Sequence, residues 1–353
     1  KRYRSDVVEL YMTYLLTFIL TLIFIYISSI ISPFFNLVDL PNKRKLHKGS
    51  VPLVGGISIY LSIFVFIFYT NINFSLLIIF LSAGIILIVG ILDDSFELGI
   101  TIRLISQLIA SLIVIGTGLS IIDIGDYYLF NPIQLGIFGI LLTVFSIVGL
   151  TNAINFVDGI DGLCSGLVLN ALLTLFFYIY ITGNSNENEI IIIKLLLVSI
   201  LAFLLINLSL TPFKKVFLGD AGSMVLGFIL SWLLIYYSHP TVRLIHPVQT
   251  IWCVALPVFD LLGVIIRRSL RKINPFKSDR RHIHHILIDL GFTPTKVLLI
   301  ILASSITLSF IGGIVYFNFG PLPALLSYFI LFLFYVYISL LLSRQIYTRN
   351  AYK

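Results

Sequence analysis

Long apolar segments alternate with short polar connections along the whole chain. A helix needs about 20 apolar residues to cross a hydrocarbon core roughly 30 Å thick, and these segments approach that length. Backbone groups in lipid are satisfied only in helices or closed barrels, and the segments are too continuously apolar for barrel strands. The pattern predicts eleven membrane-spanning helices, at residues 7–31, 51–70, 74–92, 102–122, 134–154, 162–182, 190–210, 221–237, 248–266, 297–317 and 322–342.

The composition supports an all-α polytopic membrane protein. Of the 353 residues, 59% are hydrophobic and 11% are charged, whereas soluble proteins carry about 25% charged residues. Cys164 and Cys253 fall inside predicted spans, which argues against a disulfide framework or a cysteine metal site. The first span lacks a small-residue cleavage site, which argues against a removable signal peptide. We expect a single integral-membrane domain over residues 1–353. Its motifs lie at residues 39–295, its C-terminal spans at 297–342 and its cytoplasmic tail at 343–353.

Basic residues indicate the orientation. If the loop after the first span faces the cytoplasm, most of the 23 Lys and Arg residues fall on the inner side, in agreement with the positive-inside rule. Lys1, Arg2 and Arg4 are the exception. The net charge of +7 is therefore a topology signal, and we expect no nucleic-acid partner.

The predicted inward loops hold most of the acids, whereas the outward loops are short and lack a catalytic combination. Acids, amides, glycines, basic residues and histidines gather in the inward segments, at residues 39–56, 93–103, 152–162, 211–223 and 267–285. This asymmetry predicts an active site on the cytoplasmic face.

Two adjacent carboxylates, Asp93 and Asp94, end the third span. They repel each other, so one tends to hold a proton unless a cation is near. A hard cation such as Mg²⁺ prefers oxygen ligands and keeps several waters. A solvated helix end is the alternative for this pair.

The segment NAINFVDGIDG has a polar residue at every third position. Asn152, Asn155, Asp158 and Asp161 would follow one face of a continuing helix. Their amide and carboxylate oxygens suit Mg²⁺ or ribose hydroxyls. A turn rich in Asn, Asp and Gly is the alternative.

Two further acids have two interpretations each. Asp220 precedes a span and would cap that helix, or, with Lys214 and Lys215 close by, would help to bind Mg²⁺ and phosphate at a helix N-terminus. Asp260 lies within a span, and acids in lipid are usually functional or paired. Asp260 either supports the site or forms a structural pair with Arg267.

The stretch DRRHIHHIL combines three histidines with two arginines. Zinc favours histidines four residues apart on a helix, usually with a cysteine or another third ligand. His282, His284 and His285 lack that spacing. Arg and His side chains donate well to phosphate oxygens, so a diphosphate clamp is the favoured interpretation.

Taken together, five stretches resemble the polyprenyl-phosphate N-acetylhexosamine-1-phosphate transferases. They follow the family's order over about residues 39–295 and read DLPNKRKLHKGSVPLVGGIS, LDDSFE, NAINFVDGIDGL, KVFLGDAGS and NPFKSDRRHIHHIL. The HIHH motif is similar to the corresponding motif of the WecA-like branch of this family, whose members use UDP-GlcNAc and undecaprenyl phosphate. Glu97 departs from that branch, where a third Asp is more usual, but it keeps a carboxylate.

The resemblance implies a reaction at the cytoplasmic face of a bacterial inner membrane. Undecaprenyl phosphate would attack the β-phosphorus of UDP-GlcNAc and give undecaprenyl-pyrophosphoryl-GlcNAc and UMP. This is the initiating step of a cell-surface polysaccharide pathway of the O antigen or enterobacterial common antigen type. The resemblance also implies Mg²⁺ as cofactor, with Mn²⁺ as a substitute, and contact with membrane lipids, and it is compatible with a homodimer.

The same resemblance implies a role for each motif. Asp220 and Asn155 would bind Mg²⁺. Asp93 and Asp94 would orient or deprotonate the lipid phosphate. Asp158 and Asp161 would hold nucleotide or sugar hydroxyls. The substrate-binding residues would be Asn152, Arg281, His282, His284, His285, Lys43 and His47.

Two alternatives to this reading remain. Another UDP-N-acetylamino sugar could replace UDP-GlcNAc, because no residue fixes the sugar. A secondary transporter would place coupling acids near the bilayer midplane and often shows internal repeats. Here nearly all inner acids lie at helix ends, and DD and DGIDG are not repeated.

Overall fold

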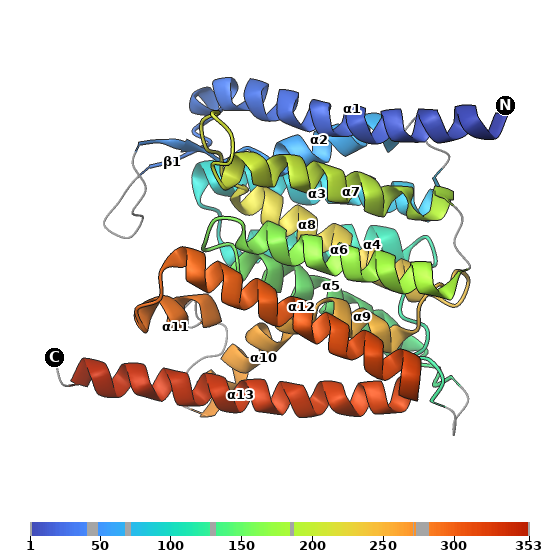
Figure 1. The fold of residues 1–353 in the computed structure, drawn as a ribbon, viewed down its shortest axis with the longest axis vertical. Helices are drawn as coiled ribbons and strands as arrows, with labels where there is room; N and C mark the ends of the chain where they lie inside the picture. Colours follow the sequence, from blue (N-terminus) through green and yellow to red (C-terminus); the bar gives the residue numbers. More distant parts are fainter. Residues whose placement is uncertain are drawn as a thin grey trace.

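The computed structural model describes residues 2–40, 49–67, 72–127, 132–183, 187–270, 272 and 282–351. The helices and strands of these residues are α1 (Arg2–Ile31), η1 (Ser32–Phe35), β1 (Val38–Asp39), β2 (Val51–Pro52), α2 (Gly55–Ile67), α3 (Phe74–Phe96), α4 (Ile100–Ile115), α5 (Ile137–Phe156), α6 (Leu163–Thr182), α7 (Glu187–Asn207), α8 (Gly219–Ser238), α9 (Pro247–Cys253), α10 (Ala255–Leu270), α11 (Ile283–Asp289), α12 (Pro294–Phe319) and α13 (Pro321–Ala351). The long helices run roughly parallel from α1 at one edge to α13 at the other (Figure 1).

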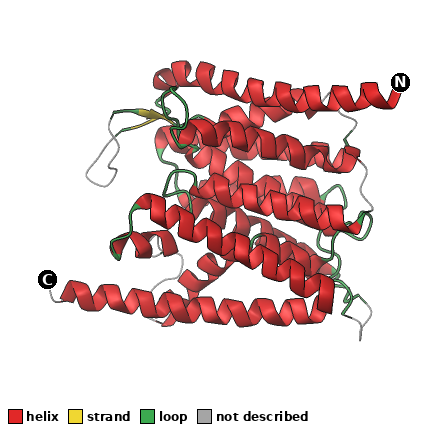
Figure 2. Cartoon of the chain, viewed as in Figure 1, coloured by secondary structure: helices red, strands yellow, loops and turns green. Residues whose placement is uncertain are grey.

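The predicted all-α membrane fold is confirmed (Figure 2). Eight described helices are long and apolar enough to cross a membrane, and α9 with α10, bent by 78°, would make a ninth span. Each of the eleven predicted segments lies mostly on a helix or on this bent pair. However, α2 and α4 have 13 and 16 residues, or about 20 and 24 Å at 1.5 Å per residue. By length, the count of eleven spans is therefore not reached.

Local backbone structure explains why α2 and α4 are short. Before α2, the residues of β2 and Leu53 pair with other segments, so the helix begins only at Gly55. After α4, the chain turns at Gly116 and Gly118, and the φ of 89° at Gly118 favours glycine. The apolar composition continues through these turns, so the pattern alone predicted longer helices.

The C-terminal part differs from the prediction in two places. Helix α13 continues through Ala351, so the described part of the predicted tail at 343–353 is helical. Helix α11 is an additional short helix that begins within the histidine motif. The single domain over residues 1–353 stays a prediction.

Helix α8 lies at the centre of the bundle, and 94% of its 18-residue apolar stretch is buried inside the protein. It packs against α2, α3 and α5, and glycines allow the helices to approach closely. A Cβ atom added at Gly56 would lie 2.0 Å from the Cα of Gly222, and one at Gly90 would lie 2.3 Å from the Cα of Ala221. Small residues permit such packing in membranes. The first turn of α8 is therefore held against α2 and α3.

A short hairpin holds the segment that leads into α8. Strands β1 and β2 pair antiparallel, and Leu53 forms a parallel bridge with Phe217. The N–H of Phe217 donates to the carbonyl of Pro52 over 2.8 Å, and the N–H of Gly55 donates to the carbonyl of Phe217 over 2.9 Å. These bonds fix the KVFLGDAGS motif at the start of α8.

Candidate active site

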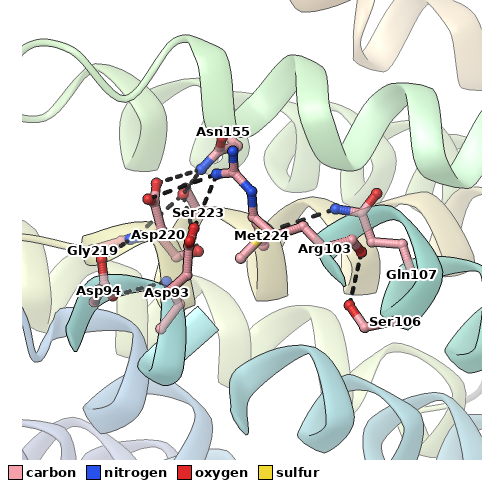
Figure 3. A network of polar contacts seen from close by, with 11 residues as sticks. Asp93, Asp94, Arg103, Ser106, Gln107, Asn155, Gly219, Asp220, Ser223 and Met224 are labelled. Carbon is pink, nitrogen blue, oxygen red and sulfur yellow. Dashed lines mark hydrogen bonds and ion pairs between the residues drawn. The ribbon is translucent and has the colours of Figure 1, made fainter. Parts of the chain in front are cut away.

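The ends of four helices meet in one polar network (Figure 3). Asp93 and Asp94 lie at the C-terminal end of α3, and Arg103 lies in the first turn of α4. Asn155 is in the last turn of α5, and Asp220 is in the first turn of α8. The structure thus brings together three motifs that the sequence placed on one face.

Arg103 lies between two of these acids. Its Nη1 is 3.0 Å from the Oδ2 of Asp93 and 3.9 Å from the Oδ2 of Asp220. Asp93 is buried, whereas 44% of the Asp220 side chain is exposed. Asp220 is therefore the more accessible carboxylate. Arg103 was not predicted as a site residue, and its only signal in the sequence is a lone basic residue shortly after the DD pair.

Asp94 caps helix α8. Its Oδ1 accepts from the N–H of Asp220 over 2.8 Å, and its Oδ2 accepts from the N–H of Ala221 over 3.1 Å. Gly219 has a φ of 78°, and a Cβ atom there would lie 2.6 Å from the Oδ2 of Asp94. Asp94 therefore positions Asp220, and its predicted action on the lipid phosphate stays a prediction.

Asn155 is hydrogen-bonded to Asp220, the other predicted metal ligand. Its Nδ2 donates to the Oδ1 of Asp220 over 2.8 Å and to the Oγ of Ser223 over 2.9 Å. Because both bonds use the amide nitrogen, the side-chain oxygen of Asn155 remains available to a cation. The structure places Asn155 and Asp220 side by side, and their binding of a metal stays a prediction.

Asn152 faces α4 rather than the acids. Its Nδ2 donates to the Oε1 of Gln107 over 2.8 Å and to the carbonyl of Val148 over 2.7 Å. Gln107 in turn contacts the Sδ of Met224 over 3.7 Å (Figure 3). These bonds tie α5 to α4 and α8 beneath the site. The predicted contact of Asn152 with substrate stays a prediction.

Asp158 and Asp161 lie on the turn between α5 and α6. Helix α5 ends at Phe156, so the two acids do not continue the helical face of Asn152 and Asn155. The turn interpretation is therefore confirmed for this half of the motif.

The turn is attached to the segment that precedes α8. The Oδ2 of Asp161 forms an ion pair with the Nζ of Lys215, and this Nζ lies 5.0 Å from the ring centroid of Phe217. The N–H of Gly162 donates to the Oδ1 of Asn207 over 2.7 Å. Lys215 thus supplies positive charge beside the predicted nucleotide-binding acids.

The site carries surplus negative charge. Asp158 is exposed as a residue, but protein atoms crowd its carboxyl group. This desolvation, together with the charges of Asp220, Asp94 and Asp161, raises the pKa of Asp158 well above its ordinary value. Such repulsion favours the binding of a cation.

His282 and His284 of the histidine motif lie beside α10 and the turn that follows α5. The Nδ1 of His282 lies 2.8 Å from the Oδ2 of Asp260. His284 is fully buried, and a Cβ atom at Gly159 would lie 2.5 Å from its Nε2. Burial and the neighbouring His285 lower the pKa of His284 to about 3, so its ring is neutral at neutral pH.

The histidines of the predicted diphosphate clamp therefore lie in different surroundings. The buried, neutral ring of His284 supports a packing role against the turn. His285 is half-buried. Contacts of His282, His284 and His285 with a diphosphate stay predictions. Arg281, Lys43 and His47 lie outside the described residues.

Comparisons with known proteins identify the family of this chain. The model of glycosyl transferase family 4 matches residues 76–238. An undecaprenyl-phosphate alpha-N-acetylglucosaminyl 1-phosphate transferase of Yersinia pestis is 33% identical over 91% of this chain and 88% of the relative. Transferases of the same name from Escherichia coli O157:H7 and Haemophilus influenzae are 34% and 33% identical over 91% and 85% of this chain, and over 88% and 86% of the relatives. The chain belongs to glycosyl transferase family 4.

The predicted resemblance is thereby confirmed. The stretch matched by the family 4 model contains Asp93, Asp94, Asn155 and Asp220. It ends before α10 and the histidine motif, so these C-terminal elements are covered by the similarity to whole relatives rather than by the family model.

Mg²⁺ fits the accessible part of this family 4 site. Asp220 and Asn155 offer a carboxylate and an amide oxygen. Among the described residues, no three His, Cys, Asp or Glu side chains form a metal site by themselves. Mg²⁺ is usually bound by one or two carboxylates together with substrate phosphates. The donor set therefore suits a cation that binds together with a diphosphate.

Proposed function

We propose that this chain transfers GlcNAc-1-phosphate from UDP-GlcNAc to undecaprenyl phosphate. A phosphate oxygen of the lipid attacks the β-phosphorus of the donor, the bond from that phosphorus to the bridging oxygen breaks, and UMP leaves. The names of relatives similar over about nine-tenths of the chain support undecaprenyl phosphate as acceptor and GlcNAc-1-phosphate as the transferred group. The observation that carries the proposal is the meeting of Asp93, Arg103, Asn155 and Asp220 at the helix ends.

The reaction requires two anions to approach each other. Arg103 and Lys215 supply the positive charge, and a guanidinium suits two phosphate oxygens at once. A phosphate monoester has a second pKa of about 6, so the lipid phosphate is largely dianionic at neutral pH and needs no strong base. Asp93 and Asp94 then act by holding Arg103 and the start of α8. Positioning of this kind lowers the barrier substantially.

We infer that Asp220 and Asn155 hold Mg²⁺, with Mn²⁺ as a substitute. When bound, the cation shields the diphosphate and stabilises charge on the departing UMP. Asp94 keeps Asp220 in place through the start of α8. Asp158 and Asp161 on the adjoining turn would bind nucleotide or sugar hydroxyls.

The site is proposed to face the cytoplasm from a bacterial inner membrane. The distribution of Lys and Arg along the sequence supports this orientation. A multi-pass membrane position suits a lipid acceptor, while helix ends suit a water-soluble donor. A homodimer and the polysaccharide pathway served stay predictions.

The test follows UMP release and lipid-linked GlcNAc together, with purified protein, undecaprenyl phosphate, Mg²⁺ and UDP-GlcNAc in detergent. Asp220→Ala should form neither product. The loops before α5 and after α8 form the end of the bundle opposite the site, which we call the far end. The matched control is Asp126→Asn in this far end. The Asp126 side chain is 70% exposed, and its variant should form both products at the wild-type rate.

The outcomes separate the substrates and the alternatives. Equal amounts of both products support the transfer. UMP without lipid-linked sugar would contradict transfer to the lipid, and products only with another UDP-N-acetylamino sugar would correct the donor. A folded wild-type protein that is inactive with all of them would refute the enzyme and leave secondary transport.

A further inference from the structure

Asp260 of α10 is a buried carboxylate with three partners on other elements. It is only 1% exposed. Its Oδ2 lies 2.8 Å from the Nδ1 of His282, and its Oδ1 accepts from the N–H of Ile283 over 3.0 Å and from the hydroxyl of Tyr335 over 2.9 Å. A buried carboxylate is costly unless it is hydrogen-bonded. Asp260 therefore ties α10 to the start of α11 and to α13.

These bonds favour one of the two interpretations that the sequence left open. Arg267 is buried on the same helix, and its positive charge attracts Asp260. The hydrogen bonds of Asp260, however, go to His282, Ile283 and Tyr335. Asp260 thus supports the histidine motif, with Arg267 contributing charge nearby.

His282 lies beside the end of α5. Its ring centroid is 5.2 Å from that of Phe156, the last residue of the helix. The ring of His284, two residues further on, packs against Gly159. Because Asp158 precedes Gly159, the histidine motif adjoins the turn that carries the site acids.

The bond to Asp260 also selects the tautomer of His282. An ionised carboxylate only accepts hydrogen bonds, so the Nδ1 of His282 carries a proton. No described residue forms a hydrogen bond with the Nε2. The Nε2 is therefore the ring nitrogen that remains for a ligand.

We propose that Asp260 is a positioning residue of the transfer reaction and holds His282 so that its unprotonated Nε2 accepts a hydrogen bond from a hydroxyl of the UDP-GlcNAc donor. The inference rests on the proposed function. Asp260 itself touches no substrate and acts through the imidazole, as carboxylates behind functional histidines do. Ile283 and Tyr335 fix the carboxylate in turn.

Asp260→Asn tests this role directly. Asn keeps an acceptor for Ile283 and Tyr335, but its amide N–H toward the Nδ1 of His282 favours the opposite tautomer. We expect kcat/KM for UDP-GlcNAc to fall about 10- to 100-fold, while KM for undecaprenyl phosphate stays unchanged. The matched control is Tyr335→Phe, which removes one bond to Asp260 but leaves the bond to His282, and its loss should be much smaller.

A double-variant cycle separates positioning from a general loss of structure. His282→Ala should lower kcat/KM at least as much as Asp260→Asn does. Adding Asp260→Asn to His282→Ala should cause no further loss, because the two residues act as one unit. Fully additive losses, or wild-type kcat/KM in a folded Asp260→Asn protein, would overturn the proposal.

A spectroscopic measurement on the wild type covers the case in which Asp260→Asn does not fold. Nitrogen NMR of protein with isotope-labelled histidine, assigned with His282→Gln, should show a proton on the Nδ1 of His282 and none on the Nε2. A proton on the Nε2, in a neutral or a doubly protonated ring, would overturn the proposal. Failure of the proposed function would be a different result, namely no product from the wild type with its proposed substrates. That result would overturn the role of Asp260 in the reaction even if the tautomer of His282 is as expected.

Discussion

The two ends of the helix bundle treat their acids differently. At the far end, Asp123 is buried, and its two oxygens lie 2.9 and 2.7 Å from the Nη2 of Arg243. At the site, Arg103 is shared between Asp93 and Asp220, and further carboxylates adjoin them. The far end neutralises its buried acid within the protein, whereas the site retains negative charge that a ligand cation can neutralise.

Histidines show the same contrast. At the far end, the Nδ1 of His246 accepts from the N–H of Val248 over 3.1 Å, and the Oε1 of Gln249 accepts from the N–H of His246 over 2.8 Å. Burial lowers the pKa of His246, which stays neutral as a helix cap. At the site, the Nδ1 of His282 instead lies 2.8 Å from the buried carboxylate of Asp260, whereas the carboxylate beside His246, that of the exposed Asp126, lies 3.6 Å from its Nε2. Proteins often give up local stability where ligands bind. The far end has the arrangement that favours stability, and the site has the arrangement that favours ligand binding.

Metal removal should have the largest effect, and only at the site. EDTA should lower the rate of UMP formation about 10³-fold, because Mg²⁺ stabilises the charge of the transferring phosphoryl group. Adding Mg²⁺ or Mn²⁺ should restore the rate. The measurement is the initial rate before and after dialysis, and a rate that resists EDTA would contradict the metal proposal.

Asp123→Asn should have the largest effect on stability. Losing the charged hydrogen bonds to Arg243 should lower the free energy of unfolding by about 2 kcal/mol, seen as a lower Tm in detergent. The transfer rate per folded molecule should not change. Asp126→Asn, on an exposed neighbour, serves as the control, and an equal Tm for all three proteins would refute the stabilising role of Asp123.

Asn152→Ala should have a moderate effect on the reaction. The substitution removes the bond that joins α5 to Gln107, so the end of α5 and Asn155 should be held less firmly. We expect kcat/KM to fall about tenfold, as for other residues that support a site from behind. Steady-state kinetics measure the change, and wild-type kinetics would show that this bond is dispensable.

Asp158→Asn should have the smallest effect on stability, and this effect should depend on pH. The raised pKa of Asp158 means that the folded state prefers the protonated acid. Stability is therefore lost as the pH rises from the ordinary carboxyl value of about 4 through the raised pKa. Asn cannot ionise, so the variant should be more stable at pH 8, by at most about 1 kcal/mol because water reaches this residue.

The difference in Tm between Asp158→Asn and the wild type should shrink toward pH 4. Thermal unfolding at several pH values measures it. A difference of constant size would point to altered packing rather than to the repulsion between carboxylates.

The apolar pattern predicted most helices, because crossing a membrane requires long apolar segments. It could not predict where α2 begins or α4 ends. Pairing of Leu53 with Phe217 and the turn at Gly118 set those limits, and apolar residues on the far side of each limit extended the apolar pattern past it.

The sequence predicted the motifs of the site but not the hydrogen bonds and ion pairs that join them. Asp94 caps α8 across 126 positions of the sequence, and Arg103 reaches Asp93 only because α4 folds back along α3. The bond from Asp260 to His282 depends likewise on how α10 and α11 pack. Periodicity within one segment carries no information about such contacts between helices.

The most direct test of the site compares Asp220→Asn with Asp123→Asn in the same detergent. We expect Asp220→Asn to keep a wild-type Tm, because 44% of this side chain is exposed and Asn retains an acceptor for Asn155, and to lose formation of lipid-linked GlcNAc. Asp123→Asn should show a lower Tm and the wild-type rate per folded molecule. Wild-type transfer by Asp220→Asn would contradict the assignment of the active site to these helix ends.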